Sequence, residues 1–268
     1  MKNDPLIFEL KIAKNKPSTF RKDKSSVCPF CDVGNLVDIY KQKNEMIWLH
    51  NRFPTLRNTL QTVLIESSDH HGDVTTYSRN KNRELIAFAR ECYWEIKNSN
   101  KFQSILWYKN YGPKSSGSLI HPHMQIVGLE NEDGYKYIHP NNFEGITVIK
   151  VGNIEVNFST HPIQGYQEIN INILDDSDTN LWADWIQVSA QYVLEKMYNG
   201  RTDSYNLFFY PRFEGKGFCC KIIPRFYASP YFVGYKLSQC NDDETLKQEV
   251  KKLKQFTLEN GESKFCRK

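Results

Sequence analysis

The chain has 268 residues, of which 40% are hydrophobic and 13% aromatic, so it can bury a substantial core in one large domain or two modest ones, and disordered and fibrous classes are excluded. Its formal charge of +4 arises from 35 basic and 31 acidic residues, a near balance that gives no support for a nucleic-acid partner. The apolar stretches fall short of a membrane span and the N-terminus lacks a signal-peptide core, so we expect a cytoplasmic protein without a membrane partner.

The first part of the chain is expected to run as a loop up to a pair of cysteines, and then to form a strand and a helix. Cys28 and Cys31 have Cys-x-x-Cys spacing in a chain with seven cysteines. In a reducing compartment such a pair is metal-binding or redox-active more often than bridged. We expect a strand over residues 62–65 and an amphipathic helix over residues 78–99.

Two apolar runs follow this helix, over residues 104–109 and 119–127. A glycine- and serine-rich link over residues 111–117 separates them. A short glycine-containing link between two apolar runs predicts a hairpin, so we expect a helix followed by two paired strands.

His121, His123 and Gln125 alternate along the second of these strands. Because alternate side chains of a strand share a face, the three polar groups are expected to project to one side. Satisfied core histidines or a surface pair are the alternative explanations of the two imidazoles. The link upstream favours a functional site, because backbone N–H groups around Gly117 and the hydroxyl of Ser118 can form an anion-binding nest beside His123.

The second half of the chain repeats an order that the first half has shown. The expected elements are strands over residues 147–151, 168–173, 205–210 and 218–223, and helices over residues 179–198 and 243–256. The order helix, strand, glycine-containing link, strand therefore occurs twice, which predicts a duplicated α+β unit. We divide the chain into two halves, residues 1–130 and 131–268. The last helix is strongly charged and is expected to be a solvated surface element.

The residues around the histidine pair resemble one particular active-site segment. Asn110-Tyr111-Gly112, Ser118 and His121-Pro122-His123-Met124-Gln125 are similar, in residue type and in spacing, to that segment of galactose-1-phosphate uridylyltransferase. This family belongs to the histidine-triad superfamily, whose transferase branch has glutamine in place of the third histidine. The resemblance extends to a bacterial branch of uridylyltransferase-like proteins.

The resemblance implies an α+β, uridylyltransferase-like fold of duplicated histidine-triad-like units, each an antiparallel sheet with helices packed on it. Residues 1–130 would then form the half with the zinc site and the catalytic strand, and residues 131–268 the half without catalytic histidines. The specific motifs run from Cys28 to Gln125, and the rest of the chain matches by architecture.

By this resemblance, His123 is the nucleophile that attacks the α-phosphorus of a nucleotide and carries the nucleotidyl group as a covalent adduct. Neutral imidazole suits this role, because it is nucleophilic near neutral pH and splits one displacement into two. Gln125 can donate a hydrogen bond to a phosphoryl oxygen but cannot act as a general acid, which favours transfer over hydrolysis. Ser118 and Asn110 match phosphate-side and ribose-side contacts of the family.

A structural zinc site is expected from Cys28, Cys31, His70 and His121. A tetrahedral site needs two nitrogen or sulfur ligands besides the two thiolates. His70 and His121 match the family's third and fourth ligands. A redox-active or idle cysteine pair remains open, as do His71 in place of His70 and iron in place of zinc.

Further contacts to the substrate are implied on both sides of the reactive strand. Asn51-Arg52-Phe53 resembles a family stretch that helps to hold the nucleoside, and Lys16-Pro17 and Arg21 fall where the family places a basic residue and a proline that reach substrate phosphate. Arg52 and Lys114 are candidate charge partners for phosphate groups. Gly117 belongs to the expected nest.

The hexose side of the resemblance is weaker. Tyr235 lies in a stretch that resembles the family's hexose contact, but Lys236 follows where the family has a glutamate. An ammonium group only donates hydrogen bonds, so it would favour an anionic group over sugar hydroxyls. The family's sugar therefore does not transfer to this chain with its mechanism.

We expect a nucleotidyltransferase that moves a nucleoside monophosphate between phosphorylated small molecules, of the UDP-hexose and hexose-1-phosphate type, through an adduct on His123. Its partners are a nucleotide or nucleotide-sugar and a phosphorylated small molecule, and a homodimer is one of the oligomeric states considered. Two alternatives stay open. One is a nucleotide-sugar phosphorylase or hydrolase of the same superfamily, and the other is a non-catalytic, zinc-stabilised nucleotide-binding module.

Overall fold

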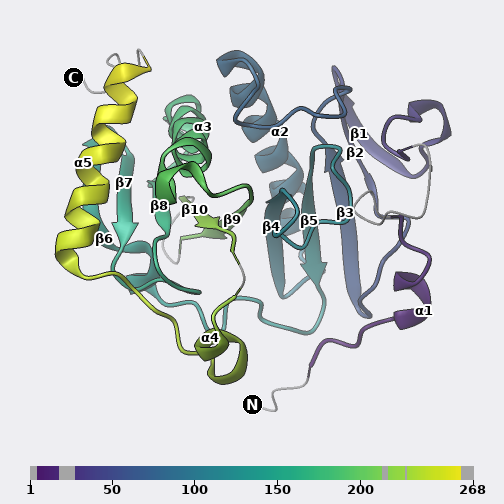
Figure 1. Cartoon of the computed structure of the whole chain (residues 1–268). Coiled ribbons are helices and arrows are strands. Elements are labelled where there is room, and N and C mark those ends of the chain that lie inside the picture. Colours follow the sequence, from purple (N-terminus) through teal and green to yellow (C-terminus); the bar gives the residue numbers. More distant parts are fainter. Residues whose placement is uncertain (1–4, 18–27, 213–216, 227, 261–268) are drawn as a thin grey trace. The chain divides into compact units, whose positions relative to one another are not determined.

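The computed structural model describes residues 5–17, 28–212, 217–226 and 228–260 (Figure 1). These residues fall into two compact units. Unit 1 consists of Met1–Gly72, Phe88–Lys109 and Gly117–Lys136, and unit 2 of Asp73–Ala87, Asn110–Ser116 and Tyr137–Lys268. Two segments that precede residue 130 thus group with unit 2, and the division at that residue stays a prediction.

Unit 1 is built on five antiparallel strands in the order β1-β2-β3-β5-β4. They are β1 (Ile39–Lys43), β2 (Met46–His50), β3 (Thr59–Ile65), β4 (Ser104–Tyr111) and β5 (His123–Leu129), and the last two residues of β4 group with unit 2. Three helical segments belong wholly or partly to this unit: α1 (Leu10–Ala13), η1 (Val33–Asn35) and α2 (Arg79–Asn98). Pairing of β4 with β5 confirms the expected hairpin-type pairing of the two apolar runs.

The two faces of this sheet bury different side chains. On one face, Trp107 donates a hydrogen bond to the Met124 sulfur at 3.3 Å, and the Tyr93 ring of α2 lies 6.3 Å from the Trp107 ring. The opposite face carries an apolar cluster that is covered by Phe30, which lies between the two cysteines, and by Leu36, which follows them. This cluster consists of Ile47, Leu49, Val63 and Ile65.

Unit 2 contains five further antiparallel strands in the order β9-β10-β8-β7-β6. They are β6 (Gly145–Val151), β7 (Ile154–Ser159), β8 (Ile169–Ile173), β9 (Tyr205–Pro211) and β10 (Phe218–Pro224). The helical segments are η2 (Pro140–Phe143), α3 (Thr179–Glu195), η3 (Met197–Gly200), α4 (Pro230–Tyr235) and α5 (Asp243–Glu259). The expected order helix, strand, strand is therefore present twice, as α2-β4-β5 and as α3-β9-β10.

Two of the helix expectations need correction. Helix α3 ends at Glu195, three residues before the predicted end, because Tyr198 and Asn199 adopt left-handed backbone angles. Helix α5 is solvated on one side only, since its other side is buried and packs against α3, β6 and β7. Its buried apolar residues follow a helical period and are Leu246, Val250, Leu253 and Phe256.

The face of the unit 2 sheet away from α3 is closed by the chain's own backbone. The asparagine side chains of β7 and β8 alternate with isoleucines and valines that face the helices. Asn157 and Asn172 each donate to the carbonyl of Phe143 at 3.1 Å, and Asn170 donates to the carbonyl of Asn142 at 3.3 Å. A short helical segment, η2, thus covers these side chains.

Within the described residues, no helix combines the length and the apolar character needed to cross a lipid bilayer.

Candidate active site and metal centre

Strand β5 begins at His123, so the expectation of one strand running through His121 is wrong at its start. Pairing with β3 begins where His123 lies opposite Ile65. Pro122 has no N–H to offer a neighbouring strand, and its carbonyl accepts a hydrogen bond from the backbone of Glu66 at 3.1 Å. His123 and Gln125 line one pocket, whereas His121 turns to a cluster of cysteine and histidine side chains.

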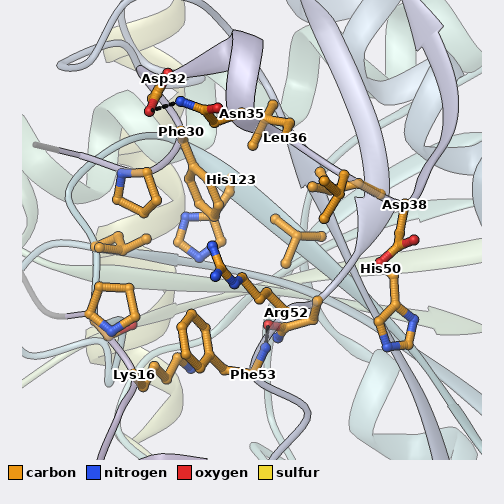
Figure 2. Close-up of a pocket in the computed structure, with 18 of the residues that line it drawn as sticks. Lys16, Phe30, Asp32, Asn35, Leu36, Asp38, His50, Arg52, Phe53 and His123 are labelled. Carbon is orange, nitrogen blue, oxygen red and sulfur yellow. Dashed lines mark hydrogen bonds between the residues drawn. The ribbon is translucent and has the colours of Figure 1, made fainter.

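The pocket lies in unit 1 and has a volume of about 280 Å³, near the lower end of the range for small-molecule sites (Figure 2). Leu49 and Val63 of the apolar cluster, together with Phe30, give it apolar walls. Its polar lining combines basic residues with acidic and amide residues. Lys16 and Arg52 bring positive charge, while carboxylates and amides come from the loop before β1. These acidic and amide residues are Asp32, Asn35 and Asp38.

His123 is 7% exposed and is held in one tautomer by the backbone. Its Nδ1 lies 2.9 Å from the carbonyl oxygen of His121, so Nδ1–H donates and Nε2 is left without a proton. Burial, helped by the positive charges of Lys109 and Lys16, lowers the pKa of His123 to about 4. The imidazole is therefore neutral at neutral pH, which is the nucleophilic form.

Arg52 reaches the pocket from the turn that follows β2. The Asn51 side chain accepts a hydrogen bond from the backbone N–H of Phe53 at 2.9 Å, a local bond that shapes this turn. The Arg52 side chain extends towards His123, and Lys16 and Phe53 lie on the same side of the pocket (Figure 2). Burial lowers the pKa of Lys16. The predicted Asn51, Arg52, Phe53 and Lys16 are thus brought together with His123.

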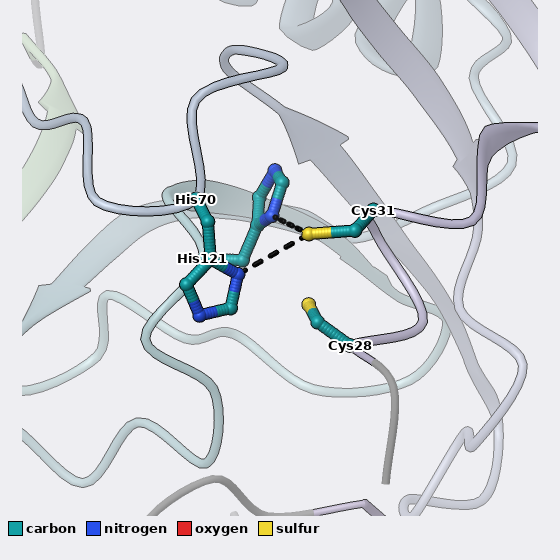
Figure 3. Close-up of side chains that lie close together, drawn as sticks. All are labelled: Cys28, Cys31, His70 and His121. Carbon is teal, nitrogen blue, oxygen red and sulfur yellow. Dashed lines mark hydrogen bonds between the residues drawn. The ribbon is translucent and has the colours of Figure 1, made fainter.

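Cys28, Cys31, His70 and His121 form a second cluster beside the pocket (Figure 3). Their ligand atoms all lie within 4.8 Å of one another. Cys31 Sγ is 3.2 Å from Nδ1 of His70 and 3.4 Å from Nδ1 of His121. Nε2 of His121 lies 2.8 Å from the carbonyl oxygen of Ser67, so Nε2–H donates and Nδ1 is the free ligand atom.

This donor set fits a metal ion of the zinc type. Two thiolates and two imidazole nitrogens make a closed tetrahedral set, and the same soft ligands accept iron. Cys28 and Cys31 are not joined by a disulfide, so both sulfurs are open to a metal ion. The set includes His70, as predicted, in preference to the neighbouring His71. The sequence therefore brings together four residues that could hold a metal ion.

Phe30 connects the two groups of side chains, and the sequence interpretation missed it. Its ring meets the ring of His121 edge-on at 5.7 Å and that of His123 at 5.3 Å. Phe30 also lines the pocket. The sequence carried one indication of this role, namely that Phe30 lies between two expected metal ligands. A Cys-x-x-Cys loop that binds metal fixes the direction of its middle side chains.

The predicted residues between the end of β4 and the start of β5 are distributed between the two units. Ser118 lines the pocket in unit 1, and Gly117 groups with unit 1 but is not among the described lining residues. Asn110 belongs to unit 2, where its side chain accepts a hydrogen bond from Asn206 at 2.6 Å. Lys114 is paired with Asp203 at 2.8 Å, so its charge is already engaged.

Tyr235 is not among the residues that line the pocket of unit 1. Tyr235 ends α4 in unit 2 with 76% of its surface exposed. Arg21 lies outside the described residues. Their roles stay predictions.

Comparison with known proteins gives family models for both parts of the chain. The N-terminal domain of a domain of unknown function (DUF4931) matches residues 8–132, and the C-terminal domain of the same family matches residues 135–255. The crystal structure of a DUF4931 family protein from Bacillus cereus ATCC 10987 is similar, with 38% identity and a TM-score of 0.73. The match covers 82% of this chain and 99% of that one.

More distant solved structures share the fold. A uridylyltransferase is 14% identical with a TM-score of 0.67, over 89% of this chain and 94% of that one. An ADP-glucose phosphorylase from Arabidopsis thaliana, solved with ADP-glucose, is 14% identical with a TM-score of 0.67, over 90% and 92%. At this identity the likeness concerns the fold alone. It confirms the expected α+β, uridylyltransferase-like fold.

One further relative matches a limited region. A di-/tripeptide transporter from Lactobacillus helveticus is 40% identical over 103 residues, which is 38% of this chain. The chain spans 20% of the length of that protein.

Proposed function

Because the chain belongs to the DUF4931 family and has a uridylyltransferase-like fold, we propose that it is a nucleotidyltransferase that works through a covalent adduct on His123. The reaction moves a nucleoside monophosphate between phosphorylated small molecules, of the nucleoside diphosphate hexose and hexose-1-phosphate type. The observation that carries this proposal is the tautomer of His123. Its Nδ1–H is used by the carbonyl of His121, so Nε2 is the nitrogen with a lone pair to attack.

Nε2 of His123 is the nucleophile of the first displacement and the leaving group of the second. Nε2 of His123 attacks the α-phosphorus of the donor, a nitrogen–phosphorus bond forms, and the bond to the leaving phosphate oxygen breaks with its electron pair. A phosphate oxygen of the acceptor then attacks the same phosphorus and releases the imidazole. Both steps are expected to give ping-pong kinetics.

The pocket supplies what these displacements need besides the nucleophile. The guanidinium of Arg52 and the ammonium of Lys16 can neutralise phosphoryl oxygens, and the hydroxyl of Ser118 can donate to one of them. The apolar surface of Leu49 and Val63 can receive the flat face of a base. The nucleotide would then lie with its phosphates at His123.

The metal cluster has a supporting part in this proposal. A zinc ion held by Cys28, Cys31, His70 and His121 would supply a cross-link and no reactive group. The ring of His121 belongs to this cluster, and its backbone carbonyl accepts the hydrogen bond from Nδ1 of His123. Holding His121 in place therefore also positions the nucleophile.

The test is a search for labelled protein. The parent, His123→Asn and His71→Asn are incubated with nucleoside diphosphate hexoses labelled at the α-phosphate, with several bases and both UDP-glucose and ADP-glucose among them. We expect acid-labile label on the parent and on His71→Asn, whose ring lies outside the cluster and the pocket, and none on His123→Asn. Absence of label with every donor, or label that persists in His123→Asn, contradicts the proposal. Chasing the label with hexose 1-phosphates, inorganic phosphate or water alone then identifies the acceptor.

A further inference from the structure

Gln125 meets a tyrosine directly across the sheet. In the pairing of β4 with β5, Tyr108 is the residue opposite Gln125. The Tyr108 hydroxyl lies 3.1 Å from Oε1 of Gln125 and donates a hydrogen bond to it. Both side chains are half-buried, on the same face of the sheet as His123, because directly opposite residues of paired strands share a face.

The phenol can act only as a donor to this oxygen. Burial raises the pKa of Tyr108 to about 12, so its hydroxyl keeps its proton at neutral pH. A glutamine amide offers an acceptor oxygen on one side and a donor NH₂ group on the other, and an unrestrained amide can present either of them. With Oε1 turned to Tyr108, the NH₂ group is the part of Gln125 left for a ligand.

This orientation decides the electrostatic sign that a phosphoryl group would meet. Gln125 lines the pocket with His123, two residues away on the same strand. An amide N–H facing a phosphoryl oxygen is attractive, whereas an amide oxygen in the same place repels it. Within the described residues, Gln125 makes no side-chain hydrogen bond other than that with Tyr108.

We propose that Tyr108 is a positioning residue that fixes the amide of Gln125, so that its NH₂ group donates to the phosphoryl oxygen on His123 in the adduct and in the transition states on either side of it. The inference rests on the proposed function. Tyr108 forms and breaks no bond in the reaction, and its effect passes through Gln125.

The experiment is a double-mutant cycle read out by single-turnover kinetics. Parent, Tyr108→Phe, Gln125→Ala and the double variant are mixed with a labelled donor that labels the parent, and the rate of adduct formation is measured. Tyr108→Phe should slow adduct formation by about tenfold, and Gln125→Ala by about a hundredfold, as expected for a misdirected and a missing donor. In the Gln125→Ala background, Tyr108→Phe should have no further effect, because the group that it positions is gone.

A matched control separates positioning from general loss of a phenol. Tyr135, also in unit 1, donates its hydroxyl to the carbonyl of Ile105. Tyr135→Phe should lower the melting temperature without slowing adduct formation. Tyr108→Phe removes a single oxygen, and its melting curve verifies that the slow variant is folded.

The outcomes distinguish this inference from the proposed function. If the parent forms no adduct with any donor, the proposed function fails and this inference fails with it. If the parent forms the adduct and Tyr108→Phe forms it at the parental rate, this inference alone is overturned. A tenfold loss that persists in the Gln125→Ala background overturns it as well, because Tyr108 would then act by another route.

Discussion

Replacing Lys109 by methionine is expected to destabilise unit 1 by about 3–5 kcal/mol, because it removes the positive charge that faces a buried carboxylate. Lys109 Nζ and Glu66 Oε1 are 2.6 Å apart, and the two side chains are 1% and 0% exposed. Lys109 belongs to β4 and Glu66 follows β3, so the pair joins two strands that β5 separates.

The magnitude follows from the burial of the pair. At a water-exposed position such a contact contributes about 0–1 kcal/mol, whereas here water cannot reach the carboxylate in place of Lys109 without opening the sheet. With about 2–4 °C per kcal/mol for a chain of this size, the single variant should melt about 6–20 °C below the parent. Thermal unfolding followed by circular dichroism measures this difference.

The double variant Lys109→Met with Glu66→Leu gives the decisive comparison. Removing both charges leaves no uncompensated carboxylate charge in the sheet, so the double variant should recover most of the stability that the single variant loses. The reasoning is refuted if Lys109→Met melts within a degree or two of the parent, or if the double variant is less stable than either single one.

Three further predictions concern the metal cluster, a turn and a helix cap. Elemental analysis should find about one metal ion per chain in the parent and in His71→Ala, and much less in Cys28→Ser. Equal metal content in the two variants would mean that the ligand set is wrong. Gly112→Ala should destabilise unit 2 by about 1–3 kcal/mol or more in urea unfolding, since Gly112 has a φ of +81° and an added Cβ would lie 2.2 Å from a backbone oxygen. The control Gly34→Ala should be nearly neutral, because a Cβ at Gly34 meets nothing within 4 Å. Similar losses of stability in the two variants would exclude backbone strain at Gly112 as the cause. Asp242 caps α5, and the backbone hydrogen bond that it accepts lowers its pKa, so its stabilising effect is present at neutral pH and is lost as the pH falls through that lowered pKa. Asp242→Asn should reduce this pH dependence in melting experiments, and an unchanged dependence would assign it to other groups.

The part of the site that lies on the reactive strand could be predicted, because its residues lie close together in the sequence. The spacing of His123 and Gln125 places both on one face once a strand is assumed, and the structure keeps them in one pocket. The Cys-x-x-Cys pair could be extended to His70 and His121 by resemblance. The start of the strand could not be predicted in the same way, because it depends on which residue of β3 first pairs with β5.

Contacts across the sheet were beyond the reach of the sequence pattern. The bond between Tyr108 and Gln125 depends on the register of two strands joined by a link of irregular conformation, and a shift by one residue would turn Tyr108 to the other face. The buried side of α5 was not predicted for a different reason. Its apolar period is visible in the sequence, but the many charged residues between those positions suggested a fully solvated helix.

The backbone that covers one face of unit 2 affects how related sequences should be interpreted. Asn157, Asn170 and Asn172 satisfy carbonyl groups that no substitution can remove, since every residue type carries them. Replacing these side chains should therefore lower stability, although none of them belongs to the proposed active site. In an alignment such a row of retained polar residues would resemble a second catalytic site, although these hydrogen bonds to the backbone are enough to explain why the residues are kept.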